Sequence, residues 1–542
     1  MTVDLEIVRD YHARTKHHFD RYAAGPDYLD WDQQPDPFRR FSNTTLIDLP
    51  LSFGHFPDAF LGDVDKLQPY KKLKSWGLPE ISSLLRFSLG LSAWKVFGPD
   101  RWALRCNPSS GNLHATECYL AIRGLSALQD GIYHYAPHEH GLELRAVFSK
   151  RDEVISNPDA EILVGLSSIA WREAWKYGER AYRYVQLDLG HAVGALAYSI
   201  ATLGLILEPV NIDSDSLATM LGIDRDADFK DAECEYPDLL LRIKSKQDQT
   251  PLPVSETWLE QAHNADWHGQ ANILSKDPHH HWQIIQSVGN ATRRSSDGNK
   301  AKPVGADLPP PLPTPKKLTR KLILQRRSAQ AFSGKSSMSR ETLYQMLDAL
   351  LSRPERTPWS SWLQQPRIHL ILFVHHIDGL DPGLYLLPRR PEIQATLKAS
   401  MADEFLWEIA AGSPDHLPLY HLLSADAKQA AQTLSCHQDI AASSYFSLGM
   451  LAEFDSTLET DGPQAYPELF WEAGLIGHVL YLQAEAAGVR GTGIGCFFDD
   501  AVHETLGLSN NLFQSLYHFT VGSAKTDDRL QTLPPYQHLH RS

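Results

Sequence analysis

Four segments of the 542-residue chain occur twice in the same order, and this repetition limits the possible folds more than any other feature. In the first part they are GIYHYAPHEHGLELR from Gly131, an apolar run from Leu187, LATMLGI ending at Ile223 and PDLLLRI from Pro237. In the second part they are PGLYLLPRRPEIQATL from Pro382, an apolar run from Trp471, HETLGL ending at Leu508 and LYHFTVG from Leu516. The last three pairs lie about 280–285 positions apart, and four echoes in one order indicate a duplication.

The repeated segments also predict the secondary structure of each half. The first pair predicts a strand that starts at a glycine, a turn and a second strand, and the last pair predicts closing strands. Amphipathic helices accompany these few strands. We therefore predict an α+β fold in which each half is a three-layer domain.

The apolar runs lie within Tyr184–Leu207 and Leu469–Val489, and each is long enough to resemble a membrane span. Both contain polar or ionisable groups that the interior of a bilayer tolerates badly. These groups are Gln186, Asp188 and His191 in the first run, and Glu472, His478, Gln483 and Glu485 in the second. We expect two helices buried in a protein core and no membrane partner.

A stretch at residues 287–317, SVGNATRRSSDGNKAKPVGADLPPPLPTPKK, is rich in Gly, Ser, Lys and Pro. Such a composition buries little apolar surface and is typical of a linker. It divides the chain into an N-terminal domain, residues 1–286, and a C-terminal domain, residues 318–542.

The composition excludes some classes of function. The formal net charge is −15, which argues against a nucleic-acid partner because such proteins present a basic face. The cysteines are few and widely spaced, so we predict no disulfide framework, a reducing compartment and no metal site; they are Cys106, Cys118, Cys234, Cys436 and Cys496. The first residues are charged and lack an apolar signal segment, so we expect a cytoplasmic protein.

The first motif with possible chemistry is the turn Pro108-Ser109-Ser110-Gly111-Asn112. Residues of these types form tight turns and cap helices. Their backbone N–H groups and hydroxyls suit a flat heterocycle with polar edges, such as a flavin. A plain loop that caps a helix accounts for the same residues.

The second motif, Gln325–Phe332, follows the predicted linker and includes Arg326, Arg327, Ser328 and Gln330. Two adjacent arginines and a serine make a good phosphate clamp, because guanidinium groups match phosphate oxygens in pairs. The alternative is a solvated basic pair.

The third motif, Arg490–Gly495, contains Gly491, Gly493, Ile494 and Gly495 and follows the second apolar run. Alternating glycines let a backbone approach a ligand closely. The spacing is not that of a dinucleotide-binding turn, which lies between a strand and a helix. A helix C-cap followed by a turn is the alternative.

The fourth motif, Trp171–Tyr184, is dense in aromatic and cationic residues. Its adjacent Lys176 and Tyr177 form a pair able to donate or accept a proton if burial lowers the pKa of the lysine. The alternative is an ion-paired and stacked start of a helix.

Together these segments resemble the nitroreductase superfamily and, more narrowly, the SagB-type dehydrogenases, the group that contains thiazole and oxazole (azoline) oxidases. The N-terminal half carries the narrower resemblance, in RCNPSSGNLHATECYL and WKYGERAYRYVQLDLGH. The C-terminal half resembles nitroreductases in RRSAQAF, GTGIG and DDRL. The resemblance implies two fused nitroreductase-like three-layer domains that form a pseudo-dimer within one chain.

In that superfamily a homodimer binds two FMN cofactors at its interface, each held by arginines and glycines of one subunit and a Pro-Ser-Ser-x-Asn turn of the other. Here the turn occurs in the first half, and the arginines and glycines occur in the second. The nearest counterpart of the arginines in the first half is Tyr70-Lys71-Lys72-Leu73-Lys74. The resemblance therefore implies one complete FMN site between the halves, with the second site lost.

The resemblance also implies a role for each residue. Arg326, Arg327 and Ser328 would hold the phosphate and ribityl chain, with a second phosphate contact from Arg529. Other residues would lie against the flavin ring: Pro108, Ser109, Ser110, Gly111, Asn112, Gly493, Ile494 and Gly495. Gln330 replaces the last arginine of the family motif, which removes one expected contact. Lys176 and Tyr177 match the catalytic Lys–Tyr pair of azoline dehydrogenases, and the sequence leaves open whether they reach the flavin.

The function implied is an FMN-dependent oxidoreductase of the SagB type that removes a hydride from an azoline or similar group in a peptide or natural product. One alternative is an NAD(P)H-dependent nitro or quinone reductase. Another is a flavin-free scaffold or binding subunit of a biosynthetic complex. The expected partners are a small-molecule or peptide substrate, and the sequence leaves further dimerisation open.

Overall fold

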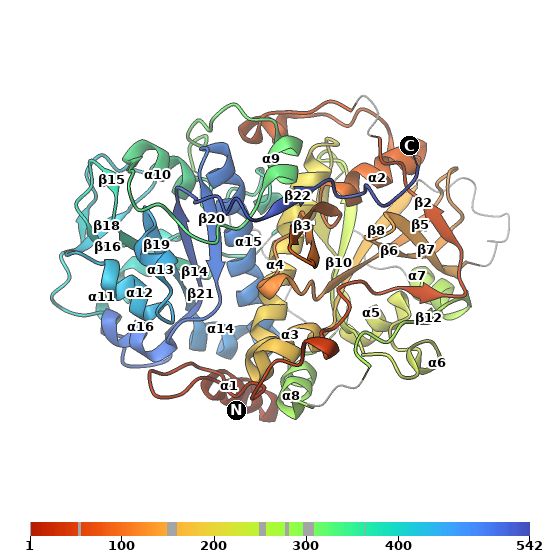
Figure 1. Ribbon diagram of the computed structural model, residues 1–542, viewed down its shortest axis with the longest axis horizontal. Coiled ribbons are helices and arrows are strands. Elements are labelled where there is room, and N and C mark those ends of the chain that lie inside the picture. Colours follow the sequence, from red (N-terminus) through yellow and green to blue (C-terminus); the bar gives the residue numbers. More distant parts are fainter. Residues whose placement is uncertain are drawn as a thin grey trace.

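Two long helices, α4 (Ala181–Ala201) and α15 (Ala465–Ala486), lie side by side at the centre of the computed structural model (Figure 1). The structure describes residues 2–52, 56–148, 160–248, 256–276, 281–295, 308–362 and 364–541. Every residue of α4 is buried, and so is all of α15 except Glu468. The apolar sequence of these helices is explained by this burial on all sides, which confirms the prediction of two buried helices.

The backbones of α4 and α15 touch at a pair of glycines. A Cβ atom built on Gly190 would lie 2.2 Å from the carbonyl oxygen of Trp471, and one built on Gly474 would lie 2.2 Å from that of Leu187. Larger residues at either position would push the helices apart.

Across the described residues, no helix is both long and apolar enough to pass through a membrane.

Each half contains one large sheet, and the strand pairs that the structure describes in both sheets are antiparallel. The N-terminal sheet has the order β11 (Asp266–Trp267), β7 (Gly141–Val147), β6 (Gly131–Ala136), β5 (Thr116–Arg123), β8 (Glu161–Ser168), β10 (Tyr236–Lys244) and β9 (Ile206–Pro209), with β2 (Leu46–Asp48) also paired to β7. The C-terminal sheet has the order β17 (Glu408–Ile409), β18 (Tyr420–Ser424), β16 (Gly383–Leu387), β14 (Ile368–Val374), β19 (Phe446–Glu453), β21 (Phe513–Gly522) and β20 (Arg490–Ile494). In chain order, strands β5 to β10 of the first half correspond to β14, β16, β18, β19, β20 and β21 of the second half. Corresponding strands occupy the same place in their sheets, which confirms two fused halves of one fold.

Each sheet is covered by helices on both faces, which makes each half a three-layer α+β domain. The inner faces pack against α4 and α15 in one common core, joined by α2 (Leu78–Arg86) and α10 (Arg340–Asp348). The outer face of the N-terminal sheet packs against α5 (Ser214–Leu221) and α7 (Glu256–His263). The outer face of the C-terminal sheet packs against α11 (Gln394–Ser400), α12 (Lys428–Leu434) and α16 (Asp499–Leu506). Central strands such as β5 and β14 are therefore buried along their whole length.

One predicted strand is wrong. The segment PEIQATL after β16 forms a short 3-10 helix, Pro391–Ile393, and then α11. The strand that pairs with β16 on the side away from β14 is β18. Pro391 has no N–H group for a ladder and its fixed φ suits the first turn of a helix. The residues that follow are good helix formers.

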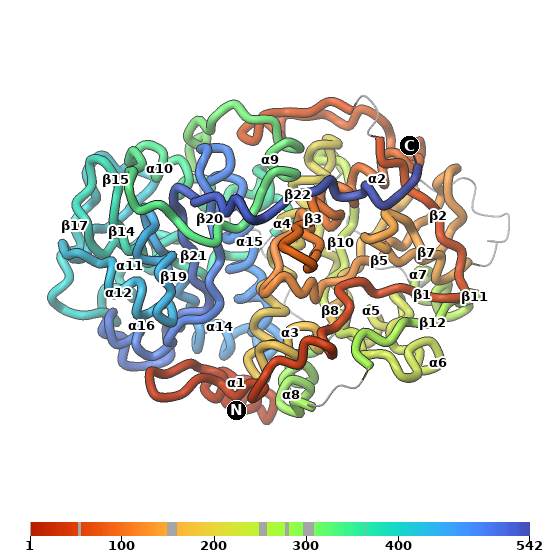
Figure 2. The backbone as a smooth tube through the Cα atoms, in the orientation of Figure 1, coloured from red at the N-terminus to blue at the C-terminus, as the bar shows by residue number. Residues whose placement is uncertain are grey.

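The two ends of the chain cross from one half to the other (Figure 2). The N-terminal helix α1 (Val3–Arg14) forms an ion pair with the C-terminal half, from Arg9 to Asp455 at 2.9 Å. The C-terminal strand β22 (Gln531–Leu533) pairs with β3 (Leu91–Phe97) of the N-terminal half, and β3 pairs with β4 (Asp100–Arg105). The halves are thus interlocked as well as fused.

The predicted linker starts inside a helix. α8 (Gln283–Ala291) runs past residue 287, because Ile285, Val288 and Ala291 bury one face of it. Residues 296–307 lie outside the described part of the chain. The last part of the segment packs on the C-terminal half, where the Leu312 N–H donates to Asp348 at 2.7 Å. The domain boundaries at 286 and 318 stay a prediction.

The cysteines also differ from expectation. Cys436 and Cys496, 60 positions apart, form a disulfide with a Cα–Cα distance of 5.8 Å. The fold brings the loop after α12 beside the end of β20, and sequence spacing carries no sign of this contact. Of the other cysteines, Cys106 and Cys118 are buried and Cys234 is exposed.

Candidate functional site

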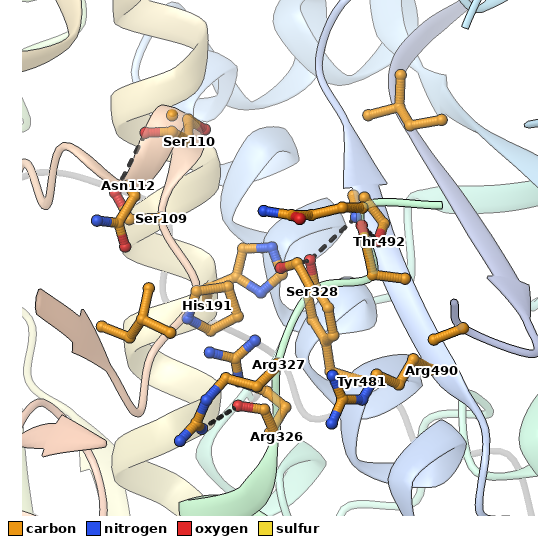
Figure 3. Close-up of a pocket in the computed structure, with 18 of the residues that line it drawn as sticks. Ser109, Ser110, Asn112, His191, Arg326, Arg327, Ser328, Tyr481, Arg490 and Thr492 are labelled. Carbon is orange, nitrogen blue, oxygen red and sulfur yellow. Dashed lines mark hydrogen bonds between the residues drawn. The ribbon is translucent and has the colours of Figure 1, made fainter. Parts of the chain in front are cut away.

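A cavity of about 980 Å³ lies between the two halves, with walls from both (Figure 3). Most of the residues singled out from the sequence line it: Pro108, Ser109, Ser110, Gly111, Asn112, Tyr177, Arg326, Arg327, Ser328, Gln330, Gly493, Ile494 and Gly495. Lys176 and Arg529 are not among the lining residues. Segments more than 200 positions apart in the chain therefore meet around one space.

The turn after β4 forms one wall of the cavity. It contains a short 3-10 helix, Ser110–Asn112, in which Gly111 and Asn112 have φ values of +56° and +62°. The left-handed backbone at these positions favours glycine and asparagine. The Asn112 amide donates to the Ala103 carbonyl at 2.9 Å, which ties the turn to β4.

Hydrogen bonds to a buried carboxylate on α4 fix this turn. Asp188 accepts hydrogen bonds from the Ser109 hydroxyl at 2.6 Å, the Ser110 N–H at 2.8 Å and the Ser110 hydroxyl at 2.9 Å. It is 1% exposed and lines the cavity. Burial raises the pKa of Asp188 to about 6, although the serine donors oppose this shift.

A second acid faces the first one. Glu173, on α3 (Ala170–Tyr177), is fully buried near Asp188, and its carboxyl oxygens have no hydrogen-bond partner among the described residues. Burial, followed by the charge of Asp188, raises the pKa of Glu173 well above its usual range. The raised pKa favours the uncharged form of Glu173 beside the Asp188 carboxylate.

The Lys–Tyr pair lies against the same turn. A Cβ atom built on Gly111 would lie 2.7 Å from the Tyr177 hydroxyl and 3.3 Å from Lys176 Nζ. Only glycine fits between the turn and this pair. Burial, with Glu173 next to it, raises the pKa of Tyr177 well above its usual range, so Tyr177 keeps its proton. The pair thus reaches the cavity wall of its own half, with Tyr177 lining the space.

Two arginines close one end of the cavity. Arg326 is 4% exposed and donates to the carbonyls of Cys106 and Arg105, each at 3.2 Å, while its Nη1 has no partner among the described residues. Arg327 donates to the carbonyl of Ser92 at 3.1 Å. These bonds to N-terminal carbonyls fix both guanidinium groups across the boundary between the halves.

Neither arginine forms an ion pair with an acidic group in the described parts of the chain. Burial lowers the pKa of Arg326, and burial together with the charge of Arg326 lowers that of Arg327 to about 10. Further cations line the cavity, namely Lys95, Arg490 and Lys525, together with the acids Glu485 and Asp527. Buried positive charge without a counter-ion is costly unless an anion binds.

The glycine-rich segment forms the wall opposite the turn. It is strand β20 at the edge of the C-terminal sheet, not the turn that was the alternative reading. The Gly493 N–H donates to the Tyr481 hydroxyl at 3.0 Å, and the same hydroxyl shares a hydrogen bond with Ser328 at 2.8 Å. A Cβ atom built on Gly493 would lie 1.8 Å from the Tyr517 hydroxyl, so the position of the Tyr517 side chain leaves room only for glycine here.

A neutral histidine lies between the two walls (Figure 3). His191 is 2% exposed, its Nε2 shares a hydrogen bond of 3.1 Å with the Tyr517 hydroxyl, and its Nδ1 has no partner among the described residues. Burial and the nearby Arg326 charge lower the pKa of His191 to about 3. The uncharged ring of His191 is one of the residues that line the cavity.

One predicted phosphate contact does not line the cavity, and a nearby lysine does. Arg529, expected to contact a phosphate, has a side chain 74% exposed and pairs with Asp527 at 2.7 Å. Lys525, four positions earlier, lines the cavity instead. Sequence reasoning missed Lys525 and the carboxyl pair; the available signal for the pair was an aspartate within an apolar helix.

Comparisons with known proteins agree with this architecture. Residues 323–523 match the family model described as Nitroreductase family. A relative from Methanocaldococcus jannaschii, provisionally named a nitroreductase, is 25% identical over 138 residues, which cover 24% of this chain and 65% of that protein. The chain thus spans just under two thirds of that relative's length.

A crystal structure from Anabaena variabilis, also provisionally named a nitroreductase, covers 96% of this chain and 99% of its own at 21% identity, with a TM-score of 0.69. This likeness extends the shared fold over both halves. The chain therefore carries a nitroreductase family domain at residues 323–523 within a structure built from two fused nitroreductase-like domains.

Proposed function

We propose that the chain is an FMN-dependent oxidoreductase with one flavin site in the cavity between its halves. The observation that carries the proposal is a pair of guanidinium groups at one end of this cavity, of the buried Arg326 and the half-buried Arg327, neither of which forms an ion pair within the described residues. A phosphate of the cofactor would supply negative charge beside them and accept their N–H donors, among them Arg326 Nη1, which has no partner in the described parts of the chain.

The rest of the cavity fits the remainder of the cofactor. Its volume of about 980 Å³ is at the large end of ordinary ligand sites. The Ser109–Asn112 turn and strand β20 form opposite walls that suit a flat ring with polar edges. Bound FMN would supply reversible transfer of a hydride.

We assign the proton chemistry to Lys176 and Tyr177, beside the turn. Tyr177 lines the cavity and keeps its proton, so it can donate a hydrogen bond to a substrate, and Lys176 lies beside it against the same turn. This arrangement favours the finer proposal of a SagB-type dehydrogenase that acts on an azoline or similar group in a peptide or natural product.

A second candidate is an NAD(P)H-dependent nitro or quinone reductase, which the match to the nitroreductase family model favours. The two candidates differ in the source of the hydride. Anaerobic mixing with NADPH distinguishes them, because rapid bleaching of the flavin supports the reductase and an unchanged flavin supports the dehydrogenase.

The decisive test is the visible spectrum of the purified protein with its flavin-to-chain ratio. We expect about one FMN per chain, and we expect Arg327→Ala to weaken FMN binding by roughly 10- to 100-fold, since a charge-assisted phosphate contact contributes about 1.5–3 kcal/mol. Arg529→Ala is the matched control and should retain FMN, because Arg529 does not line the cavity.

Changes in the other half test the shared site. Ser109→Ala combined with Asn112→Ala should also impair FMN binding, although both residues lie in the N-terminal half. If the spectrum and affinity stay unchanged, the site is not shared. A protein that stays colourless after incubation with FMN would support a flavin-free scaffold and reject both enzyme candidates.

A further inference from the structure

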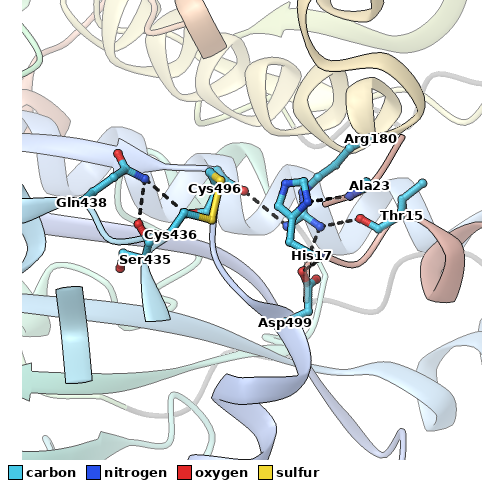
Figure 4. The surroundings of a disulfide bond; sticks show 10 residues. Thr15, His17, Ala23, Arg180, Ser435, Cys436, Gln438, Cys496 and Asp499 are labelled. Carbon is cyan, nitrogen blue, oxygen red and sulfur yellow. Dashed lines mark hydrogen bonds and ion pairs between the residues drawn. A yellow bond between two sulfur atoms is a disulfide. The ribbon is translucent and has the colours of Figure 1, made fainter. Parts of the chain in front are cut away.

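The disulfide between Cys436 and Cys496 joins the loop after α12 to the residues that follow β20 (Figure 4). Cys496 lines the cavity and directly follows Gly495 at the end of β20. Both cysteines are half-buried, in contrast to the fully buried Cys106 and Cys118. The disulfide is thus open to chemistry from a molecule in the cavity.

Other bonds already hold the two segments that the disulfide joins. The Phe498 N–H donates to the Leu434 carbonyl at 2.9 Å, and the Gln438 amide donates to the Cys496 carbonyl at 3.3 Å. Gln438 itself lines the cavity. The folded positions of these segments therefore do not depend on the covalent bond, so reduction can occur without unfolding them.

The backbone at the disulfide is strained. Cys436 has a φ of +52° and His437 a φ of +59°, in the left-handed region that residues with a side chain rarely adopt. Such conformations concentrate at functional sites. A purely structural cross-link has no need of this geometry.

Positive charge surrounds the segment of Cys496. Arg180 donates to the Gly495 carbonyl at 3.3 Å and pairs with Asp499 at 2.9 Å. The same carboxylate pairs with Arg183 at 2.7 Å, so two buried cations share one anion. His17 beside them is uncharged, because burial lowers its pKa to about 3. Arg180, bonded to the carbonyl of the residue before Cys496, would stabilise a Cys496 thiolate.

We propose that Cys436 and Cys496 form a redox-active pair that exchanges two electrons with the flavin in the cavity, an inference that rests on the proposed function. In this step two electrons and one proton leave the reduced flavin, which returns to its oxidised form. The S–S bond breaks, and the two sulfurs become one thiol and one thiolate. The dithiol therefore stores a second pair of electrons per flavin, and the reverse step restores the disulfide.

The test uses the purified flavoprotein, reduced anaerobically by light and EDTA so that no added reductant attacks the disulfide. Thiols are then alkylated in denaturant and located by mass spectrometry. We expect reduction to consume four electrons per flavin and to expose two new thiols, at Cys436 and Cys496. Cys496→Ser should consume two electrons, and the control Cys234→Ser should behave as the parent protein.

Measurements on the parent protein alone, without any substitution, can overturn the inference. Bleaching of the flavin with two electrons and no new thiols overturns it, as does alkylation of Cys436 and Cys496 before illumination. Both results leave the flavin site intact. A chain that binds no FMN overturns the proposed function and the inference together, and the same illumination of flavin-stripped protein should expose no thiols.

Discussion

Two carboxylates occupy corresponding positions on the central helices, and their surroundings differ. Asp188 lies two residues before Gly190 on α4, and Glu472 lies two residues before Gly474 on α15. Both are 1% exposed. Since Gly190 and Gly474 touch at the helix crossing, the two acids are equivalent in the duplicated fold.

In the C-terminal half the acid is neutralised by a cation. Glu472 pairs with Arg389, which is buried and stacks on Trp359 with 4.8 Å between the guanidinium carbon and the ring centre. Glu472 also accepts from the Arg367 N–H at 2.9 Å. These side chains fill the space beside α15.

In the N-terminal half the acid has hydroxyl donors and a second acid, and an open cavity lies above it. Asp188 accepts hydrogen bonds from two serines and has Glu173 beside it, while Arg326 and Arg327 line the same cavity without forming an ion pair within the described residues. Complete neutralisation therefore marks a structural position, and separated, unneutralised charges mark a ligand site. Substitutions at the two equivalent acids should behave in opposite ways.

Glu472→Gln should give the largest loss of stability. It leaves the buried Arg389 without a counter-ion, which typically costs about 3–5 kcal/mol of unfolding free energy. Urea unfolding measures the effect, with Glu468→Gln as control, because the ion pair from Glu468 to Arg294 is partly exposed and is worth about 1 kcal/mol or less. Equal losses in the two variants would contradict the structural role of Glu472.

The same comparison shows what sequence reasoning reaches. Contiguous motifs, such as Pro108–Asn112 and Arg326–Ser328, were predicted to meet, because each motif carries its chemistry in adjacent residues. The duplication also predicted the layers and the two buried helices. These predictions rest on local pattern and on order, which a single sequence contains.

Long-range pairs escaped prediction. From the sequence, Asp188 only argued against a membrane span. Its role at the turn could not be predicted, because its serine partners lie 79 and 78 positions away. The disulfide spans 60 positions, and α11 replaced a strand because the local preference of Pro391 outweighed the analogy with the other half. Spacing carries no information about contacts that only the tertiary fold creates.

Asp188→Asn should leave the unfolding free energy at pH 7 unchanged or raise it, in contrast to Glu472→Gln. The substitution keeps an acceptor for the serines and removes a buried charge that forms no ion pair within the described residues. It should weaken FMN binding a few-fold, because hydrogen bonds to a charged acceptor are stronger and fix the Ser109–Ser110 turn more firmly. Measured side by side, urea unfolding and flavin titration separate the two effects.

The pH dependence of stability sharpens this prediction. The pKa of Asp188 is about 6 in the folded protein and near 3.8 in an unfolded chain, so the folded state binds more protons between these values. Stability should therefore fall as pH rises from about 4 to about 6, by at most about 1.4 kcal/mol per pH unit. The difference in unfolding free energy between Asp188→Asn and the parent protein should grow over that window. A constant difference would contradict a raised pKa at Asp188.

Ser110→Ala should have the smallest effect. It removes one of three hydrogen bonds to Asp188 while the Ser110 N–H keeps donating to the same oxygen, so the expected loss is about 0.5–1.5 kcal/mol. Ser109→Ala should cost more, because the Ser109 hydroxyl both donates to Asp188 and accepts from the His114 N–H at 2.7 Å. Losing either donor removes an interaction that favours the ionised acid, so the decline in stability with pH should extend above pH 6 in both variants. Parallel urea titrations at pH 5, 6 and 7 measure this order, and an effect of Ser110→Ala larger than that of Ser109→Ala would contradict it.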